Sequence, residues 1–275
     1  MRANRFQAAL LHPRYWLTWF GFAVLFLVIQ LPYSFLLVIA RGLSVLMLKV
    51  AHSRRKTAAR NLELCFPDLS DTERLALLEE NFFSTTMAIF ESGMSWFWPA
   101  SRLRNLYQIK GFEHIEAAEG QGVLLMGMHF TTLDIAGAFF NIYSSCDAMY
   151  RAHKNPVYDY LQRRGRERHN ADSTMIDRKD VRGLIRTLKK GRVVWYAPDQ
   201  DYGRKYSVFA PFFNIEAATI TATSRIAKIN KSPVLILGHH RNADNKGYTV
   251  SYTPLNTQFP SSDDVADATV INQAL

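Results

Sequence analysis

A run of 25 residues without a charged side chain, from Trp16 to Ala40, constrains this 275-residue chain more than any other feature. At helical rise such a run is long enough to cross a bilayer core of about 30 Å. It exceeds the apolar region of a signal peptide, about 7 to 15 residues, and no small-residue cleavage pattern precedes Arg41. We therefore predict a retained membrane anchor.

Pro32 interrupts this run, because proline removes a backbone donor and clashes with the preceding turn. The piece before it, Trp16 to Leu31, is shorter than a full span. A kinked single-pass span and a shallow re-entrant, monotopic hairpin both remain open.

The charge of the chain is unevenly distributed. The net charge is +9, yet residues 1–60 contain nine Lys and Arg and no acidic residue, and residues 151–192 contain thirteen basic against five acidic residues. Basic residues next to an apolar span favour the cytoplasmic side and predict contact with anionic membrane lipids. We divide the chain into a membrane anchor with its basic flank, 1–60, and a cytosolic-side α/β domain, 61–275.

Beyond the anchor, helix and strand patterns alternate. Ser70 and Glu73 form a capping box that opens a helix ending before Pro99. Strands are predicted at 123–128, 148–151, 173–176, 193–197, 233–238 and 248–252, and helices at 132–142, 156–168 (capped by Asn155), 179–190 and 219–229. This order indicates a largely parallel or mixed sheet flanked by helices, with ligands at the carboxyl ends of the strands.

His129 and Asp134 form an HxxxxD pattern directly after the strand at 123–128. Residues five apart on an ideal helix point roughly 140° apart, so His129 must lie in the turn before the helix if Asp134 is to reach it. A histidine oriented by a carboxylate can act as a general base in acyl transfer. The alternative is a buried core histidine and an unrelated helix aspartate.

Further polar residues cluster in two segments. Guanidinium groups suited to phosphates or carboxylates come from Arg151, Arg163, Arg164 and Arg166. Asp199 and Asp201 lie in a loop after the strand at 193–197, a typical position for site residues. The two cysteines and the pair His239 and His240 do not have metal-ligand arrangements, so we predict no metal.

Six segments of the chain together resemble the late acyltransferases of lipid A biosynthesis, above all the lauroyl and palmitoleoyl types. These segments are LHPRYWLTWFG, NLELCFPDLS, HFTTLD, YRAHKNPVYDYLQRRGR, MIDRKDVRGLIRTLKKG and VVWYAPDQDYGRKYSVFAPFF. The HFTTLD box also occurs in the wider group of HxxxxD/E acyltransferases, whereas its combination with APDQDYG and NPxxDxxQxRGR is specific.

The resemblance implies a bacterial inner-membrane enzyme with its catalytic domain on the cytoplasmic face. It implies transfer of an acyl group, lauroyl by overall similarity, from acyl carrier protein to a 3-hydroxyacyl chain of Kdo2-lipid IVA, without a cofactor. His129 would be the base and Asp134 would orient it, while Arg151, Arg166, Asp199 and Asp201 match further motif positions. Members of the family continue beyond the segment that ends here at Leu275, so we expect a truncated carboxyl end.

Two other functions stay open at this point. A glycerolipid acyltransferase acting on a lysophosphatidic-type acceptor shares the HxxxxD chemistry. A non-catalytic membrane protein could use the 151–192 cluster to bind anionic lipid. Nucleic acid is not expected as a partner, because few aromatic residues are interleaved with the basic ones and no nucleic-acid-binding fold is indicated.

Overall fold

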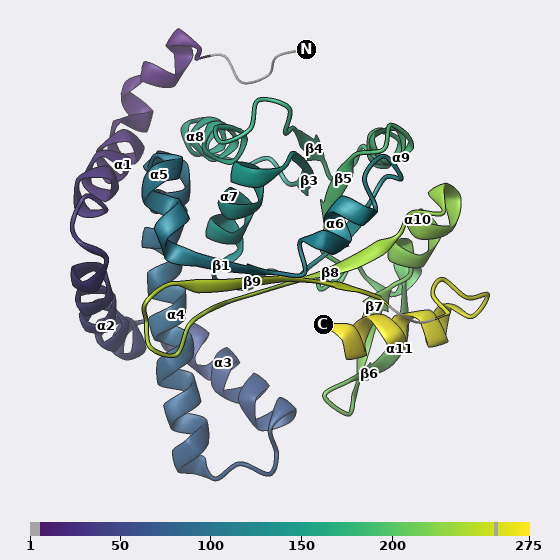
Figure 1. Cartoon of the computed structure of the whole chain (residues 1–275). Helices are drawn as coiled ribbons and strands as arrows, with labels where there is room; N and C mark the ends of the chain where they lie inside the picture. Colours follow the sequence, from purple (N-terminus) through teal and green to yellow (C-terminus); the bar gives the residue numbers. More distant parts are fainter. Residues whose placement is uncertain (1–5, 256–257) are drawn as a thin grey trace.

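The computed structural model describes residues 6–255 and 258–275, which form an α/β fold (Figure 1). The helices are α1 (Trp16–Val28), α2 (Tyr33–Val50), α3 (His52–Cys65), α4 (Asp71–Phe97), α5 (Ala100–Leu103), α6 (Glu113–Ala117), α7 (Leu133–Tyr143), α8 (Pro156–Glu167), α9 (Val181–Lys189), α10 (Ala222–Asn230) and α11 (Asp264–Ala274). The strands are β1 (Tyr107–Lys110), β2 (Leu124–Met126), β3 (Cys146–Tyr150), β4 (Met175–Asp177), β5 (Val193–Tyr196), β6 (Ser207–Phe212), β7 (Ile215–Ile220), β8 (Val234–Arg241) and β9 (Tyr248–Pro254).

Seven strands form the central sheet in the order β1-β9-β8-β2-β5-β3-β4. All neighbouring pairs are parallel except β8 and β9, so β2, β5, β3, β4 and β8 run in one direction. This confirms the predicted, mostly parallel sheet flanked by helices. It also brings the carboxyl ends of five strands to one edge.

The two faces of the sheet are covered by different helices, because alternate side chains of a strand point to opposite faces. Leu125 and Leu237 pack in a core cluster with residues of α2, α4 and α7. Leu124 and Tyr196 pack in a second cluster with residues of α9, α10 and α11. The helices α1 and α2 therefore lie on the opposite side of the sheet from α9 and α10, as Figure 1 shows.

The uncharged run is broken where Pro32 predicts a break. α1 ends at Val28 and α2 begins at Tyr33, with Pro32 in an extended conformation between them. The indole Nε1 of Trp98 donates a 2.9 Å hydrogen bond to the carbonyl of Ile29, which satisfies a backbone group at the end of α1.

Within the described residues, α2 is the one helix whose length and composition would allow it to cross a membrane. It continues past Ala40, where the uncharged run ends, and the Arg41 guanidinium donates a 2.6 Å hydrogen bond to Glu80 of α4. Leu36, Ala40 and Ser44 form a buried face of α2, which packs against α4. The apolar segment is thus attached along its length to the α/β body.

Most of the predicted helices and strands are present, but the start of one segment predicted as helix belongs to a strand. The capping box of Ser70 and the Asn155 cap are both formed. The predicted helix 219–229 is wrong in its first two residues, because Thr219 and Ile220 belong to β7. This strand pairs with β6 in an antiparallel hairpin, and β-branched residues fit such a pair well.

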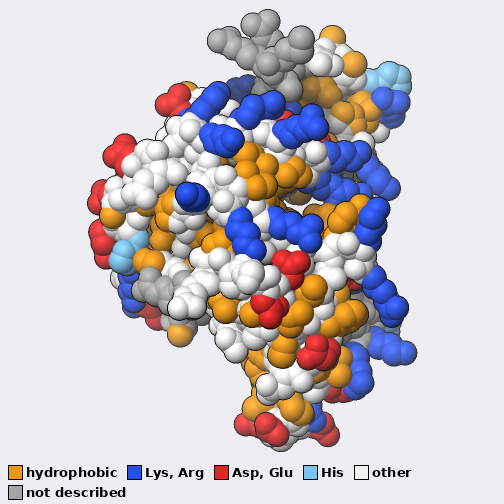
Figure 2. Space-filling model, turned by 90° about the vertical axis from the view of Figure 1, so that its right-hand side faces the viewer, with side chains coloured by type: hydrophobic (Ala, Val, Ile, Leu, Met, Phe, Trp, Pro, Cys, Tyr) orange, Lys and Arg blue, Asp and Glu red, His pale blue; other side chains and the backbone are white. Residues whose placement is uncertain are grey.

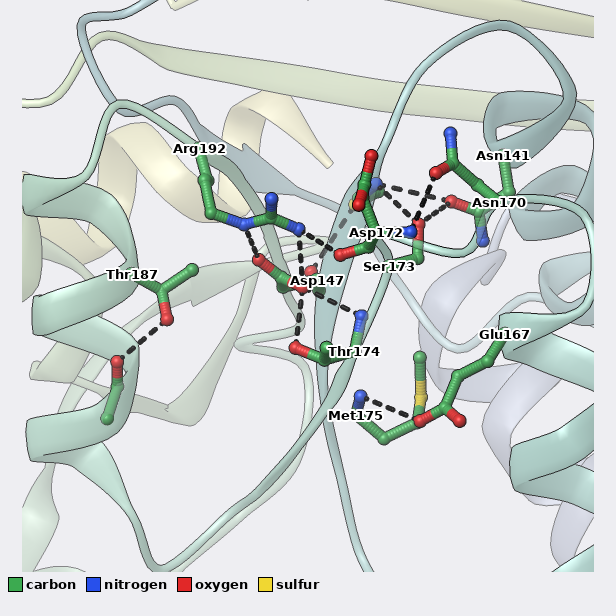
Figure 3. A network of polar contacts seen from close by, with 12 residues as sticks. Asn141, Asp147, Glu167, Asn170, Asp172, Ser173, Thr174, Met175, Thr187 and Arg192 are labelled. Atoms are coloured by element: carbon green, nitrogen blue, oxygen red, sulfur yellow. Dashed lines mark hydrogen bonds and ion pairs between the residues drawn. The ribbon is translucent and has the colours of Figure 1, made fainter. Parts of the chain in front are cut away.

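A network of polar contacts closes the amino-terminal end of the sheet near β3 and β5 (Figure 3). The Asp147 carboxylate accepts hydrogen bonds from the backbone N–H of Thr174 at 2.8 Å, its hydroxyl at 2.6 Å, and the guanidinium of Arg192. Arg192 also donates to the carbonyl of Asp172. Every oxygen of this buried carboxylate therefore has a donor, which is how a charge is accommodated in a protein interior.

Candidate active site

Four polar residues come together because their strands are neighbours in the sheet. His129 follows β2, Asp199 follows β5, Arg151 follows β3 and Arg178 follows β4. The order β2-β5-β3-β4 is continuous and these strands are parallel, so the four chain segments leave the sheet at the same edge. Ligands of α/β folds bind at this edge.

His129 is held by Asp199 through two hydrogen bonds. The backbone N–H of His129 donates to Asp199 Oδ2 at 2.8 Å, and its ring Nδ1 lies 2.7 Å from Oδ1. The Trp195 ring packs edge-to-face on the imidazole, with centroids 5.6 Å apart. The His129 side chain remains 42% exposed and that of Asp199 only 15%, so the carboxylate supports the ring from behind while the ring stays accessible.

The charge of Asp199 decides which ring nitrogen carries the proton. Burial raises the pKa of Asp199, but the side-chain and backbone hydrogen bonds from His129 outweigh it, and the net result is a lowered pKa. Asp199 is therefore ionised at neutral pH and can only accept, so we assign the imidazole proton to Nδ1. A neutral His129 then keeps a lone pair on Nε2, the nitrogen a general base needs.

Asp134 has other partners than His129. Arg166 Nε of α8 donates to its Oδ1 at 2.7 Å, and Ser92 Oγ of α4 donates to its Oδ2 at 2.8 Å. The predicted contact between Asp134 and His129 is thus replaced by one from Asp199. His129 does lie in the turn before the helix, as required, but Asp134 in the first turn of α7 is bonded to the neighbouring helices. A catalytic role of Asp134 stays a prediction.

A cavity of about 620 Å³ opens beside His129, within the range of small-molecule sites. Its apolar wall comes from α9 and α10, through Val181, Ile185, Ala222, Ile226 and Ile229. Arg151, Arg178 and Arg225 also line it, without an acidic residue among the lining. Figure 2 faces the side of the molecule that carries α9 and α10 and shows Lys and Arg side chains gathered around apolar surface.

The other predicted binding residues are not among those that line this cavity. Arg163 packs over the Tyr150 ring, and Arg164 is exposed and donates a 3.3 Å hydrogen bond to the Tyr160 hydroxyl. Asp201 accepts a 2.6 Å hydrogen bond from the backbone N–H of Gly203, which shapes its loop. Of the predicted residues, His129 and Arg151 line the cavity, and Asp199 supports His129 through its two hydrogen bonds.

The sequence reasoning missed Arg178, Trp195 and Arg225 as cavity residues. Arg178 could have been found, since it lies two residues after the strand predicted at 173–176 and inside the basic 151–192 segment. Arg225 gave no signal, because its position depends on how α10 packs against the sheet. Among the described residues there is no group of three His, Cys, Asp or Glu side chains that could hold a metal.

These features define a class of protein: an α/β enzyme with an Asp-supported histidine at the strand ends, beside an apolar, cation-rimmed cavity. A comparison with family models identifies the family within this class. The model for the bacterial lipid A biosynthesis acyltransferases matches residues 3–275. The chain therefore belongs to this family and is an acyltransferase.

Individual relatives agree with this assignment. The chain is 43% identical over 274 residues to a lipid A biosynthesis lauroyltransferase of Escherichia coli K12, covering 98% of this chain and 89% of the relative. It is 41% identical over 267 residues to a palmitoleoyltransferase of the same organism, covering 96% and 87%. A myristoyltransferase of that organism is 27% identical over 272 residues, covering 98% and 84%.

Proposed function

We propose that this protein transfers a fatty acyl group, lauroyl by preference, from acyl carrier protein to a 3-hydroxyacyl chain of Kdo2-lipid IVA. The observation that carries the proposal is His129, fixed by Asp199 at the mouth of an apolar cavity with arginines in its lining. The names of the two most similar relatives quoted above, a lauroyltransferase and a palmitoleoyltransferase, support the substrate class.

The proposed reaction needs one base that can return its proton. Nε2 of His129 accepts the proton of the acceptor hydroxyl, and the oxygen attacks the thioester carbonyl of the donor. As the tetrahedral intermediate collapses, the C–O ester bond is complete and the C–S bond breaks. The thiolate leaves and takes up the proton from imidazolium. Asp199 stabilises the positive charge that His129 carries in between.

The cavity supplies separate surfaces for the two ends of an amphipathic substrate. An acyl chain packs against α9 and α10, where burial of each CH₂ contributes about 0.8 kcal/mol. Arg151, Arg178 and Arg225 attract the phosphates and carboxylates of the lipid precursor. The preferred length of the acyl chain depends on the depth of this cavity. A difference of one methylene contributes only about 1 to 3 kcal/mol to the selectivity.

We propose that the enzyme lies at the cytoplasmic face of the inner membrane, attached through its amino-terminal helices. One face of α1 and α2 packs on the body of the protein, whereas their other side exposes large apolar residues, among them Leu17, Phe20, Leu27, Phe35 and Val38. Such a one-sided apolar surface suits monotopic immersion in one leaflet. Arg54, Arg55 and Lys56 on the exposed helix α3 add attraction to anionic headgroups.

A direct assay tests the proposal. The full chain in nanodiscs is given lauroyl-acyl carrier protein with either Kdo2-lipid IVA or lysophosphatidic acid, and the products are identified by mass spectrometry. We expect transfer to the lipid A precursor, abolished in His129→Ala. Preference for the glycerolipid acceptor would overturn the substrate assignment. Lipid binding without transfer to either acceptor would indicate a non-catalytic membrane protein.

A further inference from the structure

His239 is a buried histidine that the proposed reaction does not use. It lies on β8, is only 5% exposed, and its ring Nδ1 is 2.7 Å from the hydroxyl of Thr132, which is also 5% exposed. The Thr132 hydroxyl is in addition 3.4 Å from the backbone carbonyl of His239. The exposed ring of Phe130 packs edge-to-face on the imidazole, with centroids 5.3 Å apart. His239 thus contacts two of the three residues that follow His129.

The sheet order explains why these contacts matter. β2 lies between β8 and β5, so the turn 129–132 that leaves β2 has a neighbour on each side. On one side Asp199, after β5, bonds the backbone and ring of His129. On the other side His239, in β8, bonds Thr132 at the start of α7. The first residue of the turn is therefore held by Asp199 after β5, and its last residue by His239 of β8.

We propose that His239 is a positioning residue: by fixing Thr132 it fixes the turn 129–132 and so aims the His129 ring at the cavity. This inference rests on the proposed function, since it assigns to His239 a part in the same reaction. His239 does not contact the reacting atoms. Its contribution is geometric, and a misplacement of about 1 Å in a catalytic group can cost about 100-fold in rate.

Conservative and disruptive substitutions separate positioning from simple packing. In His239→Leu and Thr132→Val the hydrogen bond is lost while an apolar side chain fills the space. In His239→Asn and Thr132→Ser it can form, because the Asn amide nitrogen lies as many bonds from Cβ as Nδ1 does. His240→Leu, at the exposed neighbouring position, is the matched control.

The experiment measures KM and kcat, with kcat normalised to the concentration of folded enzyme. Thermal unfolding and amide hydrogen exchange of the turn are measured on the same proteins. We expect His239→Leu and Thr132→Val each to lower kcat at least tenfold with KM nearly unchanged, and the double variant to be no worse than either. The Asn and Ser variants should recover most of the rate, and His240→Leu should match the wild type. The His129 N–H, which donates to Asp199, should exchange faster in the disruptive variants.

Each contrary result has a distinct meaning. If His239→Leu and Thr132→Val lower only the unfolding temperature and leave kcat within twofold, His239 is a packing residue and the inference is wrong. If they change kcat independently of each other, the bond between them is not the cause and the inference also fails. If the wild type transfers no acyl group, the proposed function fails, and His129 amide exchange alone then decides whether the turn depends on His239.

Discussion

The two ends of the central sheet each carry an aspartate with a nitrogen-bearing partner, and the two pairs differ in character. At the amino-terminal end, the Asp147 side chain is only 1% exposed and both of its oxygens are bonded, by Arg192 and Thr174 (Figure 3). At the carboxyl-terminal end, Asp199 holds His129, whose ring is 42% exposed beside a 620 Å³ cavity. The two pairs differ in how far their groups are already bonded: both oxygens of the buried Asp147 carboxylate have donors, whereas the exposed His129 ring keeps one nitrogen available.

The largest expected effect concerns the open pair. Replacing His129 by Ala removes the base. Asp199→Asn removes the negative charge and leaves one acceptor oxygen for the two donors of His129, its backbone N–H and Nδ1–H. We expect both variants to lower kcat/KM by about 10³ to 10⁴-fold, since general-base catalysis and its orienting carboxylate contribute on that scale. Steady-state assays with the lipid A precursor measure this. A loss below tenfold in either variant would contradict the assigned roles, provided that the unfolding temperature is unchanged.

The saturated pair should show the reverse pattern. Asp147→Ala leaves Arg192 and the two donors of Thr174 without their buried acceptor. We expect the free energy of unfolding to fall by about 3 to 4 kcal/mol, because the remaining charge is no longer compensated. Activity per folded enzyme should stay within about twofold. Denaturant titration measures the stability, and turnover normalised to the concentration of folded enzyme measures the activity. A loss of turnover without a loss of stability would contradict the structural role of Asp147.

A pH effect on stability follows from His239, which burial keeps neutral by lowering its pKa to about 4. In the unfolded chain a histidine titrates near 6.5, so between these values the unfolded state binds more protons. Stability should therefore fall by about 3 kcal/mol as the pH drops from 6.5 to 4. The fall should be smaller in His239→Asn, and equal pH profiles of the two proteins would disprove this origin.

The smallest effect is expected at the rim of the cavity. Arg151→Ala should raise KM for the anionic lipid by up to about tenfold with kcat unchanged, since one charge-assisted hydrogen bond contributes about 1.5 kcal/mol or somewhat more. Arg164→Ala, at an exposed position of α8 away from the cavity, is the matched control and should leave KM unaltered. Equal effects of both substitutions would show that the cavity arginines have no special part.

The local features of the fold could be predicted from the sequence, because their signals lie within a few residues. The Ser70 capping box, the Asn155 cap and the break at Pro32 are examples. The hairpin of β6 and β7 was not predicted, because β-branched residues such as Thr219 fit a strand or the start of a helix equally well in isolation.

The sequence predicts the two central residues of the candidate site, but not that they pair with each other. His129 and Asp199 were both singled out, yet they are 70 residues apart and meet only because β5 lies beside β2. Nothing local to either residue specifies that order of strands. Asp134 looked like the partner because it is near in sequence, whereas its carboxylate is bonded to Arg166 and Ser92.

The central claim, that Asp199 fixes the His129 ring with its proton on Nδ1, is tested most directly by the ring-nitrogen NMR spectrum of ¹⁵N-histidine-labelled protein. The His129 signals are assigned by their loss in His129→Ala. We expect the proton on Nδ1 of a neutral ring in the wild type and in Asp134→Asn, and a changed tautomer in Asp199→Asn. His129 signals that stay unchanged in Asp199→Asn but shift in Asp134→Asn would contradict the role assigned to Asp199.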